Sequence, residues 1–426
     1  MTSGALALIA AVVFAWGAFS AKLEHADLTA PMVFVGVGVL LAEGVPADAD
    51  AAGVTLLTEA TLAWVLFSDA SRVGLRELRG DAGVFGRLLG LALPLSVVAG
   101  AAGAWVLLDA PLPWYALLIG AALAPTDAAL GAVVITHPAV PARIRNILNV
   151  ESGLNDGIVT PVVLVALAGA ASSPGHAGGN AFAAALQLVG GAVIGVAAGA
   201  TGGWLLRVAG RRGWTDDSFA GPAVLALALI AYASSVAMHG NGFVAAFAGG
   251  IAFGHVAGRG GPREVFYVEQ TAGLASLLVW LLFGVLAVPL LYGRIDGPLL
   301  LYAVLSLTAV RMIPVAVSLV GSRLGGRTVL FVGWFGPRGL ASVVFALLAI
   351  EELGERAAPA VAAIVLTVLL SVVAHGLTAR PAAVRYGASG GPPDTRAGLG
   401  PAAAVRLRRS PRQHGPGAAV PNDRVP

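Results

Sequence analysis

Residues 124–157 read APTDAALGAVVITHPAVPARIRNILNVESGLNDG, and the fold is built around this stretch. It lies within some of the most apolar sequence of the chain, yet it carries the carboxylates of Asp127, Glu151 and Asp156. An ionisable side chain at the depth of a lipid bilayer is energetically expensive and marks a functional site. We therefore expect the rest of the chain to form a scaffold that holds this stretch and balances its charge.

The composition of the chain is that of a membrane protein. Hydrophobic residues make up 57% of its 426 residues and charged residues only 12%, whereas a soluble domain carries about 25% charged residues. Cysteine is absent, which excludes disulfides and thiolate metal sites. The first apolar segment has no basic residue before it and no clear cleavage site, so we interpret it as a retained helix and not as a signal peptide.

Membrane-spanning helices need about 20 mostly apolar residues each. The sequence therefore predicts an all-α polytopic membrane protein whose transmembrane domain covers residues 1–380. The last part of the chain, residues 381–426, is rich in Pro, Gly and Arg and predicts a disordered cytoplasmic tail. About thirteen segments qualify as transmembrane helices: 3–21, 30–43, 52–70, 84–108, 113–136, 146–170, 181–207, 218–238, 241–257, 266–290, 298–320, 328–350 and 357–379.

The distribution of charge between these segments supports the count. Loops after odd-numbered segments carry the basic residues, among them Arg72, Arg143 and Arg211. Loops after even-numbered segments carry mainly acidic residues, such as Asp109 and Glu352. Because basic residues stay on the cytoplasmic side of a membrane, we expect the N-terminus outside and the C-terminus in the cytoplasm.

Two proline breaks suggest an internal duplication. Pro125 interrupts the fifth segment and Pro337 the twelfth. If 181–207 is a linker helix, residues of about 1–170 and 218–380 form two six-helix repeats, each broken in its fifth helix. The first repeat starts outside and the second inside, so the repeats are inverted. Paired broken helices that cross near the membrane midplane are typical of a transporter's binding site.

One face of the sixth segment is polar. With about 100° per helical residue, Glu151, Ser152, Asn155 and Asp156 fall within an arc of about 140°. Lipid does not accept such a face, so it points into the bundle or a water-filled cavity. Its oxygen atoms suit a hard cation such as Na⁺. The alternative is a buried hydrogen-bond network that only joins helices, but such a network rarely needs two acids.

The break in the fifth segment adds further groups to this face. Pro125 removes a backbone donor and unwinds the helix, which leaves carbonyl oxygens that can coordinate a cation. Thr126 offers a carbonyl and a hydroxyl, and we count Thr126 and Asp127 among the cation- and proton-binding residues. Asp127 can also balance the positive N-terminal ends of two half-helices that meet at the break. A simple proline kink with a water-satisfied Asp127 is the alternative.

Arg338, in the twelfth segment, needs a partner because its guanidinium stays protonated at that depth. Glu151 and Asp127 are the candidates, and we favour a structural Glu151–Arg338 ion pair. Asp156 is then left free to bind either a proton or a cation, but not both. Competition for one site gives exchange, and a single free carboxylate beside Asn155 predicts electroneutral exchange of one proton for one monovalent cation.

Four further charged residues fall within the predicted helices. Asp69 is predicted either to line the entry path and reach the ion through water, or to be an interfacial residue beside Arg72. Glu59 lies deeper in the same segment, and the sequence does not place it. We interpret Glu269 and Arg311 as members of structural pairs or as snorkelling side chains. No two histidines have metal-ligand spacing on a helix, so we expect no cofactor and no metal beyond the transported cation.

The APTD and ESGLNDG motifs, followed by FGPRGLAS around Arg338, resemble the NhaP-type monovalent cation:proton antiporters, relatives of the eukaryotic sodium/proton exchangers. The resemblance covers about residues 3–380. It implies a homodimer in which a core domain moves against a dimerisation domain in alternating access.

The resemblance also implies roles for single residues. Asp156 would be the main ion and proton carrier, Ser152 and Thr126 would assist coordination, Asn155 would orient its neighbours, and Glu151 would pair with Arg338. Many members carry an acid directly after a phenylalanine in the third span. In this chain Ser68 follows Phe67, and the acid, Asp69, comes one residue later.

The predicted function is therefore the exchange of Na⁺, with Li⁺ or K⁺ as variants, for H⁺ across the cytoplasmic membrane. A K⁺/H⁺ antiporter is the nearest alternative, and a cation channel, which would collapse both gradients without coupling, comes from a different class. A membrane-embedded hydrolase would need a nucleophile–base pair or a metal site. The sequence contains no convincing Ser–His or HExxH arrangement, so we predict no enzymatic activity and no nucleic-acid partner.

Overall fold

The computed structural model describes residues 3–25, 28–42, 51–73, 80–110, 112–171, 177–257 and 262–388. All regular elements within these ranges are helical, as predicted. In chain order they are α1 (Ser3–His25), α2 (Ala30–Leu41), α3 (Ala51–Arg72), α5 (Ala82–Arg87), the π turn η2 (Leu88–Ala92), α6 (Leu93–Leu107), α7 (Pro113–Ala122), α8 (Ala132–Thr136), α9 (Ala142–Ala171), α10 (Ala177–Arg211), α11 (Asp217–Ala237), α12 (Gly242–Val256), α13 (Pro262–Leu282), η3 (Phe283–Ala287), η4 (Val288–Leu291), α14 (Gly297–Leu307), α15 (Ala309–Ser318), α16 (Gly326–Trp334), α17 (Leu340–Leu353), η5 (Gly354–Ala357) and α18 (Ala358–Ala388).

Each of the thirteen predicted segments coincides with one helix or with two or more consecutive helical elements. Eight helical stretches of the described residues are long and apolar enough to cross a membrane, and α2, α7 and α12 are shorter apolar helices. These lengths are typical of a multi-pass membrane protein. The count of thirteen crossings stays a prediction.

The predicted boundary of the tail is wrong. Helix α18 continues past residue 380 to Ala388, although Pro381 lies inside it. The ring of Tyr386 stacks on Phe331 of α16 at 4.2 Å between centroids, and its hydroxyl lies 2.8 Å from that of Thr328. This packing holds the end of α18 against the bundle. The rest of the predicted tail, 389–426, lies outside the described residues.

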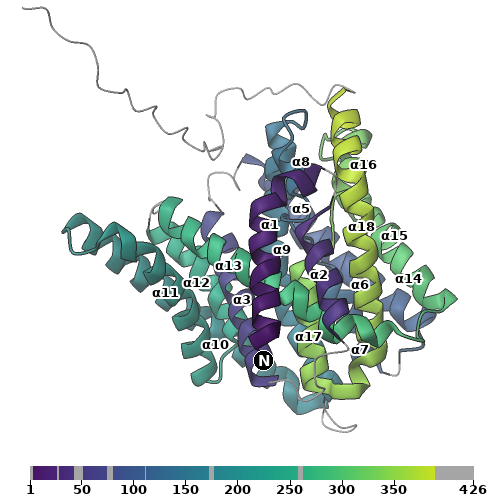
Figure 1. The fold of residues 1–426 in the computed structure, drawn as a ribbon, viewed down its shortest axis with the longest axis horizontal. Helices are drawn as coiled ribbons and strands as arrows, with labels where there is room; N and C mark the ends of the chain where they lie inside the picture. Colours follow the sequence, from purple (N-terminus) through teal and green to yellow (C-terminus); the bar gives the residue numbers. More distant parts are fainter. Residues whose placement is uncertain are drawn as a thin grey trace, which may run out of the picture. The chain divides into compact units, whose positions relative to one another are not determined.

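The helices of residues 3–388 pack in two groups. In the first, α3 contacts α11, α12 and α13, and α10 contacts α11 and α12. In the second, α7 contacts α6 and α9, while α18 contacts α14 and α17. Figure 1 shows α10–α12 on one side and α14, α16 and α18 on the other, and α9 touches α3 and α12 across the seam.

Glycines allow the closest approach within the first group. A Cβ atom at Gly195 or Gly199 of α10 would overlap the backbone of Ala245 or Gly249 in α12. Small residues let membrane helices pack this closely. A larger residue at either position would force α10 away from α12.

Two helices are broken where the sequence predicts it. Residues 123–131 separate α7 from α8, and residues 335–339 separate α16 from α17. The two breaks meet, because the backbone N–H of Asp127 donates a hydrogen bond to the carbonyl of Pro337 at 2.9 Å. The crossing of broken helices is thus confirmed. The inverted relation of the two repeats, with 181–207 as linker, stays a prediction.

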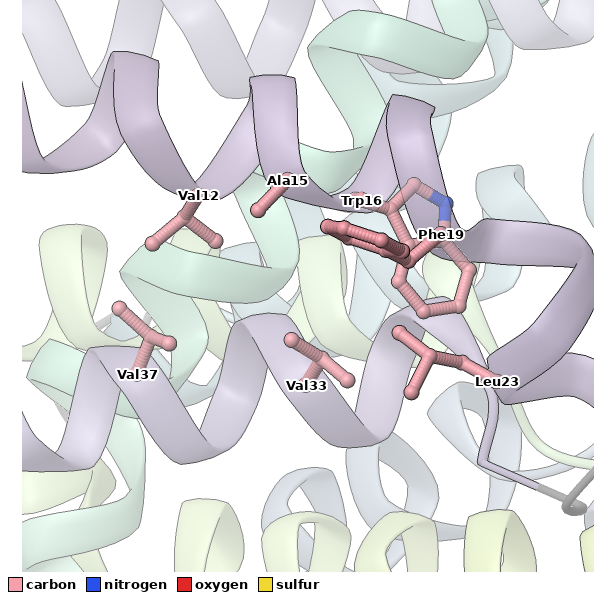
Figure 2. A pocket seen from close by; sticks show the side chains of 7 residues that line it. All are labelled: Val12, Ala15, Trp16, Phe19, Leu23, Val33 and Val37. Atoms are coloured by element: carbon pink, nitrogen blue, oxygen red, sulfur yellow. The ribbon is translucent and has the colours of Figure 1, made fainter.

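A pocket between α1 and α2 is apolar (Figure 2). None of its lining side chains is titratable, so this pocket is not the ion site. They are Val12, Ala15, Trp16, Phe19 and Leu23 of α1 with Val33 and Val37 of α2.

Candidate functional site

The polar face of α9 points into the bundle, as predicted. Its four residues are almost fully removed from the surface, with exposed fractions of 2% for Glu151, 8% for Ser152, 0% for Asn155 and 8% for Asp156. Because buried polar groups need partners or ligands, the hydrogen bonds of these four residues define what the site can bind.

Hydrogen bonds join this face to the break between α7 and α8. The Thr126 hydroxyl lies 2.9 Å from the Ser152 hydroxyl. The Asn155 amide nitrogen donates to the Thr126 hydroxyl at 2.7 Å. The structure therefore brings together Thr126, Ser152 and Asn155, three of the residues predicted to bind the cation.

Two oxygens of this cluster are left without donors. The amide oxygen of Asn155 and Oδ1 of Asp156 are buried and accept no hydrogen bond from the described part of the chain. An unmet buried acceptor costs about 1–3 kcal/mol. A bound proton or cation at Asp156, or a bound cation at Asn155, would remove this cost. That Asp156 carries the ion stays a prediction.

Asp127 uses both carboxylate oxygens on backbone donors. Its Oδ1 accepts hydrogen bonds from the N–H groups of Ala129 at 2.7 Å and Leu130 at 3.3 Å. Its Oδ2 accepts from the N–H of Leu340, the first residue of α17, at 2.9 Å. A Cβ at Gly339 would overlap the Asp127 side chain, so glycine permits this approach. Asp127 thus contacts the N-terminus of one half-helix, α17. Its balancing of a second half-helix and its binding of a cation stay predictions.

Asp127→Asn is expected to destabilise the crossing. The amide nitrogen of Asn would face a backbone N–H in place of an acceptor oxygen, and losing a helix cap costs about 0.5–2 kcal/mol. The thermal unfolding midpoint in detergent should fall. Asp109→Asn is the control, because Asp109 is exposed and its positive φ of 45° also suits Asn. Equal midpoints for the two variants would argue against the capping role.

The predicted Glu151–Arg338 ion pair is wrong. Nη2 of Arg311, on α15, donates to Oε1 of Glu151 at 2.6 Å, and the two side chains are 1% and 3% exposed. The guanidinium of Arg311 therefore neutralises the carboxylate of Glu151. The interpretation of Arg311 as a member of a structural pair is confirmed. Its partner is Glu151, the acid that the sequence predicted to pair with Arg338.

Arg338 instead binds backbone carbonyls at the crossing. Its Nη1 donates to the carbonyls of Ala124 at 2.8 Å and Pro125 at 3.2 Å, and Nη2 donates to that of Ser306 at 3.3 Å. The carbonyls freed by the proline break were expected to coordinate a cation. Those of Ala124 and Pro125 are satisfied by Arg338, which stabilises the unwound segment.

The sequence interpretation missed a second support of the crossing. The backbone N–H of Arg338 donates to the Ser371 hydroxyl at 2.7 Å, and that hydroxyl lies 3.1 Å from Nδ1 of His375. Nε2 of His375 lies 2.9 Å from the carbonyl of Trp334, at the end of α16. The signal in the sequence was a serine and a histidine four residues apart, which share one face of α18.

Asp69 lies between the polar face and solvent. Its Oδ1 is 3.2 Å from Nη2 of Arg72, and its side chain is 30% exposed. A Cβ at Gly153 of α9 would lie 3.5 Å from the Cβ of Asp69, so Asp69 packs one turn before Asp156. Both sequence interpretations of Asp69 thus have support in its position, and contact with the ion stays a prediction.

Glu59 occupies a different place on α3. It is half-buried, and Tyr232 of α11 and the carboxylate of Glu351 lie near it. Over the described ranges, no group of three or more His, Asp or Glu side chains could hold a metal ion.

The family model described as "Sodium/hydrogen exchanger, transmembrane" matches residues 7–385. The K(+)/H(+) antiporter NhaP of Alkalimonas amylolytica is 27% identical over 59% of this chain and 43% of its own length. The K(+)/H(+) antiporter NhaP2 of Shewanella sp. (strain MR-4) is 25% identical over 80% of this chain and 59% of its own length. The chain thus spans about half the length of these relatives.

Among solved structures, the sodium proton antiporter MjNhaP1 from Methanocaldococcus jannaschii at pH 8 is similar. The TM-score is 0.73 and the sequence identity 20%, with 90% of this chain and 98% of that chain covered. An electron-microscopy structure of the same antiporter gives a TM-score of 0.69 at 19% identity. The fold is therefore shared over nearly the whole solved chain.

Proposed function

Because the chain belongs to the sodium/hydrogen exchanger family, we propose that it is a secondary transporter that exchanges a monovalent cation for a proton across a membrane. The observation that supports this most is the unmatched carboxylate of Asp156. On the same face and at the adjacent break, Glu151 is neutralised by Arg311 and Asp127 accepts backbone hydrogen bonds. Asp156 is the acid left to bind an ion.

The proposed mechanism uses one carboxylate for both ions. With a proton bound Asp156 is neutral, and with a monovalent cation bound the pair is neutral. The loaded site thus has the same charge in both states, and exchange is electroneutral. An empty, ionised Asp156 would carry a bare charge through the membrane interior, which is expensive. That cost disfavours movement of the unloaded site and couples the two fluxes.

Oxygens around Asp156 complete the proposed ion site. Thr126 and Ser152 supply hydroxyls, and Asn155 supplies an amide oxygen. The Thr126 hydroxyl joins the three side chains, because it lies 2.9 Å from the Ser152 hydroxyl and 2.7 Å from the Asn155 amide nitrogen. Hard monovalent cations are bound by such oxygens. Na⁺ and K⁺ are both candidates, since two of the relatives are named K(+)/H(+) antiporters and the solved one a sodium proton antiporter.

The setting of the site is part of the proposal. The charge distribution of the loops favours a cytoplasmic-membrane protein with its N-terminus outside and its C-terminus in the cytoplasm. We place alternating access at the seam between the two packing groups, where α9 meets α3 and α12. Association of two copies as a homodimer completes this scheme, and no cofactor takes part.

Flux in liposomes tests the proposed function. Purified protein is reconstituted with an internal pH dye, and Na⁺, Li⁺ or K⁺ gradients are imposed with the membrane potential clamped at different values. We expect proton flux that depends on the cation and not on the potential. Collapse of both gradients without coupling would indicate a channel, and dependence on the potential would contradict electroneutral exchange.

A further inference from the structure

We propose that Arg72 is a built-in competitor for the entering cation, held at the mouth of the ion path by Asp69 and Glu269. This inference rests on the antiport function proposed above. It assigns a role in apparent cation affinity to two residues, Arg72 and Glu269, that lie outside the binding cluster.

One guanidinium serves two carboxylates from different helices. Arg72 is the last residue of α3, and its Nη2 lies 3.2 Å from Oδ1 of Asp69 on the same helix. Its Nη1 forms an ion pair with Oε1 of Glu269 on α13. The side chains of Arg72, Asp69 and Glu269 are 49%, 30% and 25% exposed, so water reaches all three.

Asp69 is the member of this cluster that lies nearest to the polar face of α9. It packs on Gly153, one helical turn from Asp156 on α9. Asp156 is only 8% exposed, whereas the side chain of Asp69 is 30% exposed. A cation that approaches from this end of the bundle therefore meets Asp69 before Asp156.

The charges explain why Arg72 competes. A guanidinium keeps its proton, so a cation can use Asp69 fully only when Arg72 moves away. Ion pairs exposed to water are weak, which makes this displacement feasible. Glu269 gives the displaced guanidinium a second acceptor, so Arg72 need not lose its partner when it leaves Asp69.

The net charge of the cluster gives the direction of each substitution. Asp69, Glu269 and Arg72 together carry one negative charge. Arg72→Gln makes the cluster doubly negative and frees Asp69, whereas Glu269→Gln makes it neutral and leaves Arg72 entirely to Asp69. Local charge of one sign concentrates the opposite ion at a binding path.

The test is the dependence of proton flux on cation concentration in liposomes. We expect Arg72→Gln to lower KM for the cation about 3- to 10-fold and Glu269→Gln to raise it by a similar factor, with little change in kcat. Arg72→Lys, which keeps the charge, should stay near the wild-type KM. In the double variant Arg72→Gln/Glu269→Gln, adding Glu269→Gln should raise KM by a smaller factor than it does in the wild-type background, because no guanidinium remains to be displaced from Asp69.

Arg211→Gln is the matched control, since it removes one arginine from an exposed helix end of the same predicted side. An unchanged KM in Arg72→Gln, or the same change in Arg211→Gln, would overturn the inference and leave the antiport function standing. If Arg72→Gln does not assemble, an unchanged KM in Glu269→Gln overturns it. Absence of cation-coupled flux in the wild type would instead overturn the proposed function.

Discussion

Asp156→Asn is expected to abolish cation-coupled proton flux. Asn cannot carry the proton, and it offers no charge to balance the cation. The cation would have to enter the buried site as an uncompensated charge, which costs about 3 kcal/mol or more at the centre of a bilayer and corresponds to a loss of about 100-fold. The side chain keeps its shape, so the variant should fold and reach the membrane.

Proteoliposome flux at saturating cation concentration measures this loss. Asp69→Asn is the matched control: it removes a carboxylate from the mouth of the path, 30% exposed, and should keep turnover while changing KM. Exchange in Asp156→Asn at a rate near that of the wild type would show that another group carries the ion.

Glu151→Gln is expected to have the largest effect on stability. It leaves the Arg311 guanidinium charged and 1% exposed, without its carboxylate. Nε and Nη1 of Arg311 already have no hydrogen-bond partner within the described ranges, so Glu151 supplies the one hydrogen bond seen for this guanidinium there. Removing one partner of a buried pair costs about 3–5 kcal/mol. The yield of folded protein and its thermal unfolding midpoint in detergent should both fall sharply.

The double variant Glu151→Gln/Arg311→Gln distinguishes the loss of the whole ion pair from the loss of one of its two charges. Removing both charges leaves no unpaired guanidinium, so part of the lost stability should return. Glu352→Gln, at an exposed position of α17, serves as the neutralisation control and should unfold like the wild type. A Glu151→Gln variant as stable as that control would contradict the structural role of the pair.

Local properties of the sequence predicted the helices and their breaks. Hydropathy is read one segment at a time, and the flanking motifs APTD and FGPRG mark Pro125 and Pro337 as helix breaks. The inward direction of the α9 face follows from the spacing of its polar residues along one helix. These features needed no knowledge of which helices are neighbours.

Partners distant in the chain could not be predicted in this way. The sequence predicted Arg338 as the partner of Glu151, but in the fold it is Arg311 on α15, 160 residues from Glu151, that reaches this acid. Arg338 binds the carbonyls of Ala124 and Pro125 because the crossing brings them within its reach. The end of α18 is fixed by Tyr386 on Phe331, a contact that composition alone does not reveal.

Release of protons on cation binding tests the shared site most directly. Na⁺, Li⁺ or K⁺ is added to purified protein in weakly buffered detergent solution, at a pH where flux is observed, and the released protons are counted. If one carboxylate holds either ion, the wild type releases up to about one proton per chain and Asp156→Asn releases none. Equal release from both proteins, or cation binding by the wild type without release, would contradict a site in which Asp156 trades a proton for a cation.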